Sequence, residues 1–226
     1  LQLAQLLVER GDIIGARKYL TRSLRRIKRL GIPHAKPLAM HVQLDVATSM
    51  AQQEEADAAI EFFATRRHAP EGVEASIVRY WRTQGEVDKA MAIAAPMSKG
   101  WGYVLWRLER AMVSLCAADF NTANMELHSI SMIQGLPNFR DLYLYFQLLH
   151  EFAQNQRWEH WNRRVVTATN TLYLPLIMAA LELSARRMVK EGRGQSSHTL
   201  WETLYARAEE LGYRPGVELA LRHLHD

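Results

Sequence analysis

Apolar residues recur along the chain at intervals of three and four, the period of an amphipathic helix. Leu3, Leu6 and Leu7 mark one such helix, and Ile13 and Leu20 belong to the next, after a break at Gly11-Asp12. Between the sparse glycines and prolines the residues are mostly strong helix formers. No segment shows the alternation and paired turn residues of a β-hairpin. The pattern predicts an all-α chain of about ten to twelve helices.

These helices recur as antiparallel pairs. One face of each helix needs a small residue so that its partner can approach closely. In the second helix of each pair the aligned positions are Ala16, Ala59, Ala90 and Ala123, with Trp161 as a poor fifth. Their intervals of 43, 31, 33 and 38 residues lie around the roughly 34-residue period of paired-helix arrays. The first helices carry small residues at Ala4, Ala47 and Ala111.

The recurrence resembles the tetratricopeptide repeat (TPR) family. The first repeat carries the likeness best, with Leu3, Ala4, Leu7, Gly11, Ala16, Leu20, Ser23 and Leu24. The resemblance implies helix pairs stacked into a right-handed superhelix, or solenoid, whose first helices line a concave surface. We expect about five pairs over residues 1–175, and further helices over 176–226 that cap the same domain.

Long second helices that end in Leu-Gly-x-Pro, as in Arg29-Leu-Gly-Ile-Pro33, add a second likeness. They resemble the superhelical sensor domain of large ATP-binding LuxR-type transcription activators, and Glu210-Leu-Gly-Tyr-Arg-Pro215 repeats the ending. This implies a bacterial signalling or transcription-regulating protein that binds a protein partner or an effector. The same ending occurs in bacterial arrays fused to response-regulator receivers. An interaction module of a two-component response regulator and a small-molecule sensor therefore stay open as alternatives.

The TPR register also assigns candidate contact positions on the concave groove. They include arginine, histidine and aromatic side chains, which suit a peptide or a modest polar ligand. The set comprises His41, Thr48, Gln52, Arg79, Arg82, Tyr143, Phe146 and His150. An ordinary polar concave face without a dedicated pocket is the competing interpretation.

A basic stripe runs along the second helix. Lys18, Arg22, Arg25 and Arg29 step by four, three and four, and no acidic residue occurs between Asp12 and Asp45. The stripe is typical of a solvated helix face whose cations near the C-terminus favour the helix dipole. The functional alternative is a face for an anionic partner, with an acidic protein surface preferred to nucleic acid. Aromatic residues that would stack bases are not interleaved with the basic ones.

The composition fits a globular protein, with 48% hydrophobic and 23% charged residues among 226, and a net charge of +4. The single cysteine, Cys116, excludes an intrachain disulfide and agrees with a cytoplasmic location. No apolar run reaches the roughly 18 residues of a membrane span. The chain begins at a leucine inside a helical pattern, so we expect a fragment of a longer protein.

Motifs for chemistry are lacking in the sequence. No metal-binding or phosphate-loop motif occurs, and Cys116 has no base at fixed spacing. We therefore expect no enzymatic activity, no metal and no cofactor. The expected partner is a protein or peptide, or a small effector, and no membrane. A homodimer is a further possibility, since solenoid ends expose apolar surface unless they are covered.

Overall fold

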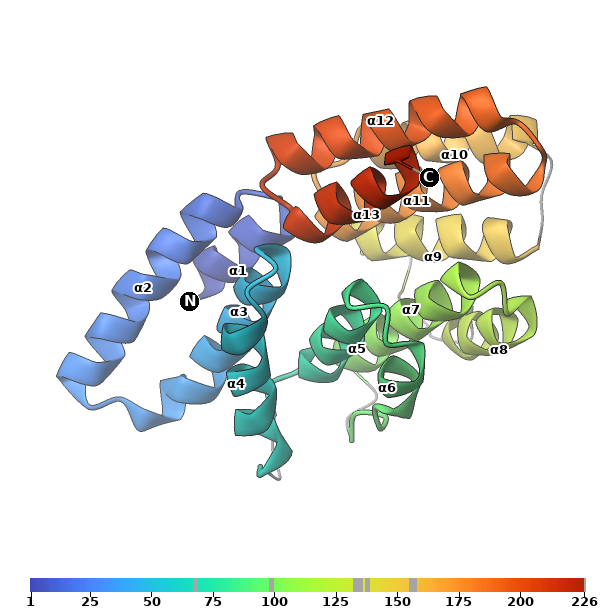
Figure 1. The fold of residues 1–226 in the computed structure, drawn as a ribbon. Coiled ribbons are helices and arrows are strands. Elements are labelled where there is room, and N and C mark those ends of the chain that lie inside the picture. Colours follow the sequence, from blue (N-terminus) through green and yellow to red (C-terminus); the bar gives the residue numbers. More distant parts are fainter. Residues whose placement is uncertain (67–68, 98–99, 132–135, 137–138, 155–157, 226) are drawn as a thin grey trace.

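The computed structural model describes residues 1–66, 69–97, 100–131, 136, 139–154 and 158–225 (Figure 1). Within these ranges the chain is helical and contains no strand, so the all-α prediction is confirmed. Thirteen α-helices occur there, against an expectation of about ten to twelve, because two are short: α1 has 8 residues and α6 has 6. The helices are α1 (Gln2–Glu9), α2 (Ile13–Leu30), α3 (Lys36–Ser49), α4 (Gln53–Ala64), α5 (Val73–Thr83), α6 (Val87–Ala92), α7 (Trp101–Cys116), α8 (Phe120–Ser131), α9 (Arg140–Ala153), α10 (Trp158–Thr169), α11 (Leu174–Lys190), α12 (Gly194–Glu210) and α13 (Arg214–His225), with a 3₁₀ turn at Pro33–Ala35.

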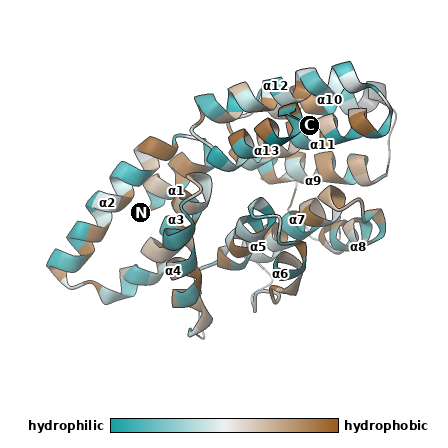
Figure 2. Ribbon diagram, viewed as in Figure 1, coloured by the Kyte–Doolittle hydropathy of each residue, from teal (hydrophilic) through white to brown (hydrophobic). Residues whose placement is uncertain are grey.

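Helix α2 shows why these segments are helical and where they stop. The Asp12 carboxylate caps its start by accepting a hydrogen bond from the Gly15 N–H at 2.8 Å. Gly31 ends the helix in the left-handed conformation, with φ of 61°. Its buried side is apolar and its outer side basic, and the alternation is visible along the ribbon in Figure 2. Burial of one face against α1 and α3 therefore holds the helix.

One turn geometry recurs between consecutive helices. In the first pair, the Gly11 N–H donates to Val8 O at 3.0 Å and the Asp12 N–H donates to Leu7 O at 2.9 Å. These are the two hydrogen bonds of a Schellman motif, with Gly11 at the left-handed position. The same two bonds and a positive φ recur in the turns centred on Ala51, Gly85, Ala118, Gly192 and Gly212.

The turn geometry also fixes the register of the repeats and corrects one alignment. The residue five places after the left-handed residue is Ala16, Ala90 or Ala123 in three of the turns, and each is fully buried as predicted. In the second pair this position is Ala56, so the alignment on Ala59 was shifted by three residues. Both alanines are buried because they lie on the same face of α4, which is why the sequence pattern did not separate them. The corrected intervals are 40, 34 and 33 residues.

The first helices of the pairs contact one another in the order α1, α3, α5, α7, α9 and α11. The chain then returns on itself, because α11 also contacts α1 and α7, while α13 contacts α3. One hydrophobic cluster contains Ala4 and Val8 of α1 together with Leu181 of α11 and Trp201 of α12. Figure 1 shows the turn between α1 and α2 beside the turn between α12 and α13. The first and last helices therefore share a core.

Candidate binding pocket

A cavity of about 360 Å³ lies between α5, α6 and α7 on one side and α11, α12 and α13 on the other. Its walls are largely apolar, and its charged groups gather at the floor and at the rim beside α13. The volume is at the lower end of the range for small-molecule sites. The apolar lining includes Val87, Val113, Met178, Leu204, Tyr213 and Leu219.

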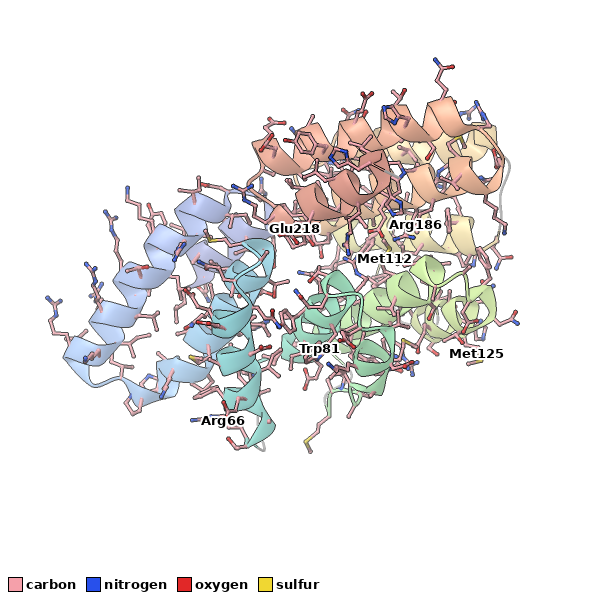
Figure 3. The ribbon with its side chains drawn as sticks, in the orientation of Figure 1. Arg66, Trp81, Met112, Met125, Arg186 and Glu218 are labelled. Carbon is pink, nitrogen blue, oxygen red and sulfur yellow. The ribbon has the colours of Figure 1, made fainter. Side chains whose placement is uncertain are left out.

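Glu182 of α11 is the acidic residue in the lining, and three side chains donate hydrogen bonds to it. Its Oε1 accepts from Arg186 Nη2 at 2.9 Å and from the Cys116 thiol at 3.3 Å. Its Oε2 accepts from Arg82 Nη1 at 3.3 Å. These residues come from α5, α7 and α11, and Figure 3 shows Arg186 extending from α11 toward α7. The carboxylate thus ties three of the first helices together.

A second carboxylate, Glu109 of α7, continues this network deeper into the protein. Its side chain is fully buried, and its Oε1 accepts hydrogen bonds from Arg79 Nε at 3.0 Å and Arg79 Nη2 at 2.8 Å. Arg82 Nε lies 3.8 Å from Glu109 Oε2, so Arg82 stands between the two carboxylates. A buried carboxylate is tolerated only with such paired cations.

Helical spacing positions these groups. Arg79 and Arg82 are three residues apart on α5 and share a face, as Glu182 and Arg186 do at a spacing of four on α11. Glu109 and Cys116 are seven residues apart on the same face of α7. The surrounding positions on α7 and α11 are mostly apolar and buried, so the charged groups of the network pair chiefly with one another.

Charge and burial set the protonation states in the network. Burial alone would raise the pKa of the Glu182 carboxyl, but Arg82 and then Arg186 outweigh it, and the pKa lies below its ordinary value of 4.5. Burial, followed by the charge of Glu182, raises the pKa of the Cys116 thiol far above its ordinary value. Glu182 is therefore ionised and Cys116 is a neutral thiol at neutral pH, so Cys116 is held as a hydrogen-bond donor and not as a nucleophile.

The eight predicted groove residues do not meet in one open groove. Arg79 and Arg82 belong to the buried network, and Arg82 also lines the pocket. His41 and Thr48 are buried, and His41 Nε2 lies 3.0 Å from Ser76 Oγ of α5. His41 and Thr48 are shielded from solvent where α3 contacts α1 and α5.

The remaining groove residues lie elsewhere. Gln52 precedes α4, where its side-chain amide lies beside the guanidinium of Arg17 on α2. Tyr143, Phe146 and His150 form a half-buried aromatic row on α9, with ring centroids 6.4 Å and 5.6 Å apart along the row. Recognition of a partner by these residues stays a prediction.

The basic stripe is solvent-exposed along its whole length. Lys18, Arg22, Arg25 and Arg29 all lie on the outer face of α2. None of them forms an ion pair with another residue in the described part of the chain. Arg22 lies 5.9 Å from the centroid of the Tyr19 ring. The stripe is therefore available to an anionic partner, and that partner stays a prediction.

A buried histidine, serine and aspartate come together between α3 and α5 but lack the geometry of a catalytic triad. Asp45 Oδ2 is 3.6 Å from His41 Nε2, the same nitrogen that faces Ser76. In a triad the acid holds one ring nitrogen and the nucleophile faces the other. His41 therefore cannot be oriented by Asp45 while it accepts a proton from Ser76.

Sequence reasoning missed Glu182 and Arg186, which line the pocket with Arg82, and Glu109, which continues their network deeper in the protein. An acid inside an apolar helix is the signal that could have found the two glutamates, because such a residue requires a buried cation.

Within the described ranges, no cluster of three or more His, Cys, Asp or Glu side chains is placed to hold a metal ion, and no helix has the length and apolar character to cross a membrane. Comparisons with protein-family models, curated proteins and solved structures gave no significant match.

Proposed function

We propose that this chain is a TPR-like binding module, in which helix pairs stack in a right-handed superhelix and the inner wall receives an effector or a short protein segment. The pocket carries the proposal. It is lined by first helices of three pairs and closed by the last helix, α13. Its charged floor is held by hydrogen bonds before any ligand arrives, which lowers the entropic cost of binding.

The proposed role is regulatory and not catalytic. A ligand in the pocket contacts α5–α7 on one side and α13 on the other, so it favours the arrangement in which both sides fit it. Such a ligand stabilises one position of α13 relative to the pocket floor. In a bacterial signalling or transcription-regulating protein, attached domains would respond to this change in the position of α13, as the resemblance to sensor arrays implies.

The test is whether the pocket holds a ligand that survives mild purification. Native mass spectrometry of the protein is expected to show an added mass that a pocket-filling variant, Val87→Trp, lacks. Val87 lines the pocket and is 39% exposed, so a larger side chain there fills the space without overpacking the core. Met125→Trp is the matched control, because Met125 is 67% exposed on α8, away from the pocket (Figure 3). Equal added mass in Val87→Trp and wild type, or none in any of the three proteins, argues against the proposal.

A second candidate contact is an acidic protein surface docking on α2. The four cations of the basic stripe support it, because none of them is neutralised by a described acidic residue. Binding through this face is expected to weaken as salt rises and to be lost in Arg22→Gln/Arg25→Gln/Arg29→Gln. Polyglutamate and duplex DNA are the two probes. Tighter binding to DNA would replace the acidic protein by nucleic acid as the partner.

A further inference from the structure

The pocket has more positive charge than its own acidic groups neutralise. Three arginines line it, Arg82 on α5, Arg186 on α11 and Arg222 on α13, against the single acidic residue Glu182. Both oxygens of Glu182 are already occupied by Arg82, Arg186 and the Cys116 thiol. No further carboxylate lines the cavity within the described residues. The surplus positive charge therefore lies on the arginines that line the pocket.

The deeper part of the network does not remove this surplus. Glu109 pairs mainly with Arg79, whose Nη2 is 2.8 Å from it, and lies farther from Arg82 at 3.8 Å. Arg79 also interacts with the charges of Asp45 and Glu9, and none of these three residues lines the pocket. Arg79 is therefore balanced by acidic groups outside the cavity. Among the lining residues the three arginines exceed Glu182 by two charges, and Glu109 offsets part of this surplus where it approaches Arg82.

Arg222 is the group best placed to receive a ligand. It is exposed on α13 and lines the pocket, and it has no hydrogen-bond or ion-pair partner among the described residues. The neighbouring His223 is held by stacking on Trp201, with ring centroids 4.2 Å apart, which fixes this part of α13 over the cavity. A guanidinium at the rim offers the paired N–H donors that match a carboxylate.

The rest of the cavity suits an apolar body. Val113, Met178 and Leu204 form walls that offer no charge to a ligand. The volume of about 360 Å³ equals that of about a dozen waters in the liquid, which leaves room for about ten non-hydrogen atoms. A head group at the rim and a short hydrocarbon chain within the walls would use both features.

Resting on the proposed function, we propose that the ligand is a small organic carboxylate. Its carboxylate group is bound by Arg222 with support from Arg186, and its apolar body fills the space between α7, α11 and α12. The anion balances the surplus charge of the three arginines. A neutral ligand of the same shape would leave that charge unbalanced and would bind more weakly.

The experiment compares octanoate with octanamide, which differ in charge but hardly in shape. Ligand-observed NMR titrations of the 226-residue protein at constant ionic strength give both affinities. Octanoate is expected to bind about tenfold more tightly than octanamide, the usual value of one charge-assisted hydrogen-bonded contact. Arg222→Gln is expected to lower octanoate affinity about tenfold and to leave octanamide affinity unchanged.

Two controls separate this inference from folding defects and from general electrostatics. Arg25→Gln removes one exposed arginine on α2, outside the pocket lining, and should leave both affinities unchanged. Thermal unfolding without ligand should be the same for Arg222→Gln and wild type, since Arg222 holds no described contact.

Each other outcome overturns the inference. Equal affinity for octanoate and octanamide shows a pocket that binds a neutral ligand, which rejects the carboxylate but keeps the proposed function. An unchanged octanoate affinity in Arg222→Gln rejects the assignment of the head group to α13. If neither probe binds up to its solubility limit, the carboxylate class is rejected, and the proposed function is judged by the Val87→Trp comparison alone.

Discussion

Gly11 packs directly against Leu211, although one residue lies in the first turn of the chain and the other at the end of α12. A Cβ added to Gly11 would lie 2.9 Å from Leu211 Cδ2, closer than real side-chain contacts allow. Gly11 also has φ of 80°, so it serves both the turn and the junction between the two ends of the chain. This junction is where the last helices meet the first.

The junction can be tested by a pair of glycine substitutions. Gly85 has φ of 77° and nothing within 4 Å of an added Cβ, so Gly85→Ala reports backbone strain alone. It is expected to lower the free energy of unfolding by about 1 kcal/mol. Gly11→Ala adds the clash with Leu211 and should lose about 2–3 kcal/mol. Urea unfolding measures both, and equal losses would mean that the contact with Leu211 contributes nothing.

A complementary prediction concerns the turn after α7. Ala118 occupies the left-handed position with φ of 59°, where an alanine is strained. Ala118→Gly is therefore expected to raise the free energy of unfolding by about 0.5 kcal/mol, after the entropic penalty of glycine in the unfolded chain. Ala123→Gly, in the buried interior of α8, should lower it by about 1 kcal/mol or more. If Ala118→Gly destabilises the protein in the same assay, the turn is not strained.

The buried ion pair of Glu109 predicts a large and non-additive effect. Glu109→Gln keeps the shape of the side chain but leaves Arg79 without its carboxylate, and the expected loss is about 3 kcal/mol. Adding Arg79→Gln should recover part of that loss, because the second change removes the unpaired charge. The exposed pair Glu86–Lys89 is the control, and Glu86→Gln should change stability by less than about 0.5 kcal/mol. Strict additivity of the two network substitutions would rule out the coupling.

Stability should depend on pH with opposite signs at two glutamates. The pKa of Glu182 is lowered in the folded protein, so its contribution is present above pH 4.5 and is lost as pH falls through the lower folded value. The pKa of Glu9 is raised, because neighbouring helices partly desolvate the carboxyl and Asp45 repels its charge, and solvent weakens both effects since Glu9 is exposed. The folded state therefore favours protonated Glu9, and that stabilisation fades as pH rises through the folded pKa.

Two variants measured across pH separate these effects. Glu9→Gln is expected to stabilise the protein at pH 7, with the gain disappearing below about pH 4.5. Glu182→Gln should destabilise it at pH 7, with a smaller difference in acid. Chemical unfolding from pH 3 to 8 provides the profiles. A pH-independent gain in Glu9→Gln would show that the carboxyl titrates normally.

The sequence predicted the parts of the fold that are set locally. Helical periodicity, the turn at Gly11 and the burial of Ala16, Ala90 and Ala123 all follow from choices within a few residues of one another. The register of the second pair was missed because Ala56 and Ala59 are both small and both buried. Only the turn geometry at Ala51 shows that Ala56, and not Ala59, holds the position equivalent to Ala16, Ala90 and Ala123.

The pocket could not be predicted from such local sequence patterns. Arg82 and Glu182 are 100 positions apart, and Arg79 and Glu109 are 30 apart, so their pairing depends on how the helices pack in three dimensions. The sequence named Arg79 and Arg82 as inward-facing but assigned them to a ligand. In the structure both arginines donate hydrogen bonds to acids buried among apolar residues, and periodicity alone does not match these partners to one another. Their contact with a ligand stays a prediction.

A stack of repeats in which each unit contacts only its neighbours can fray from either terminus. Here Trp201 and Ala4 belong to one cluster, so neither α1 nor α12 can open without exposing the other. Amide hydrogen exchange should then show α1 and α12 protected to the same degree, as parts of one cooperative unit. Folding should also be slower than in a linear array of equal length, since this shared core forms only when segments far apart in the sequence have met.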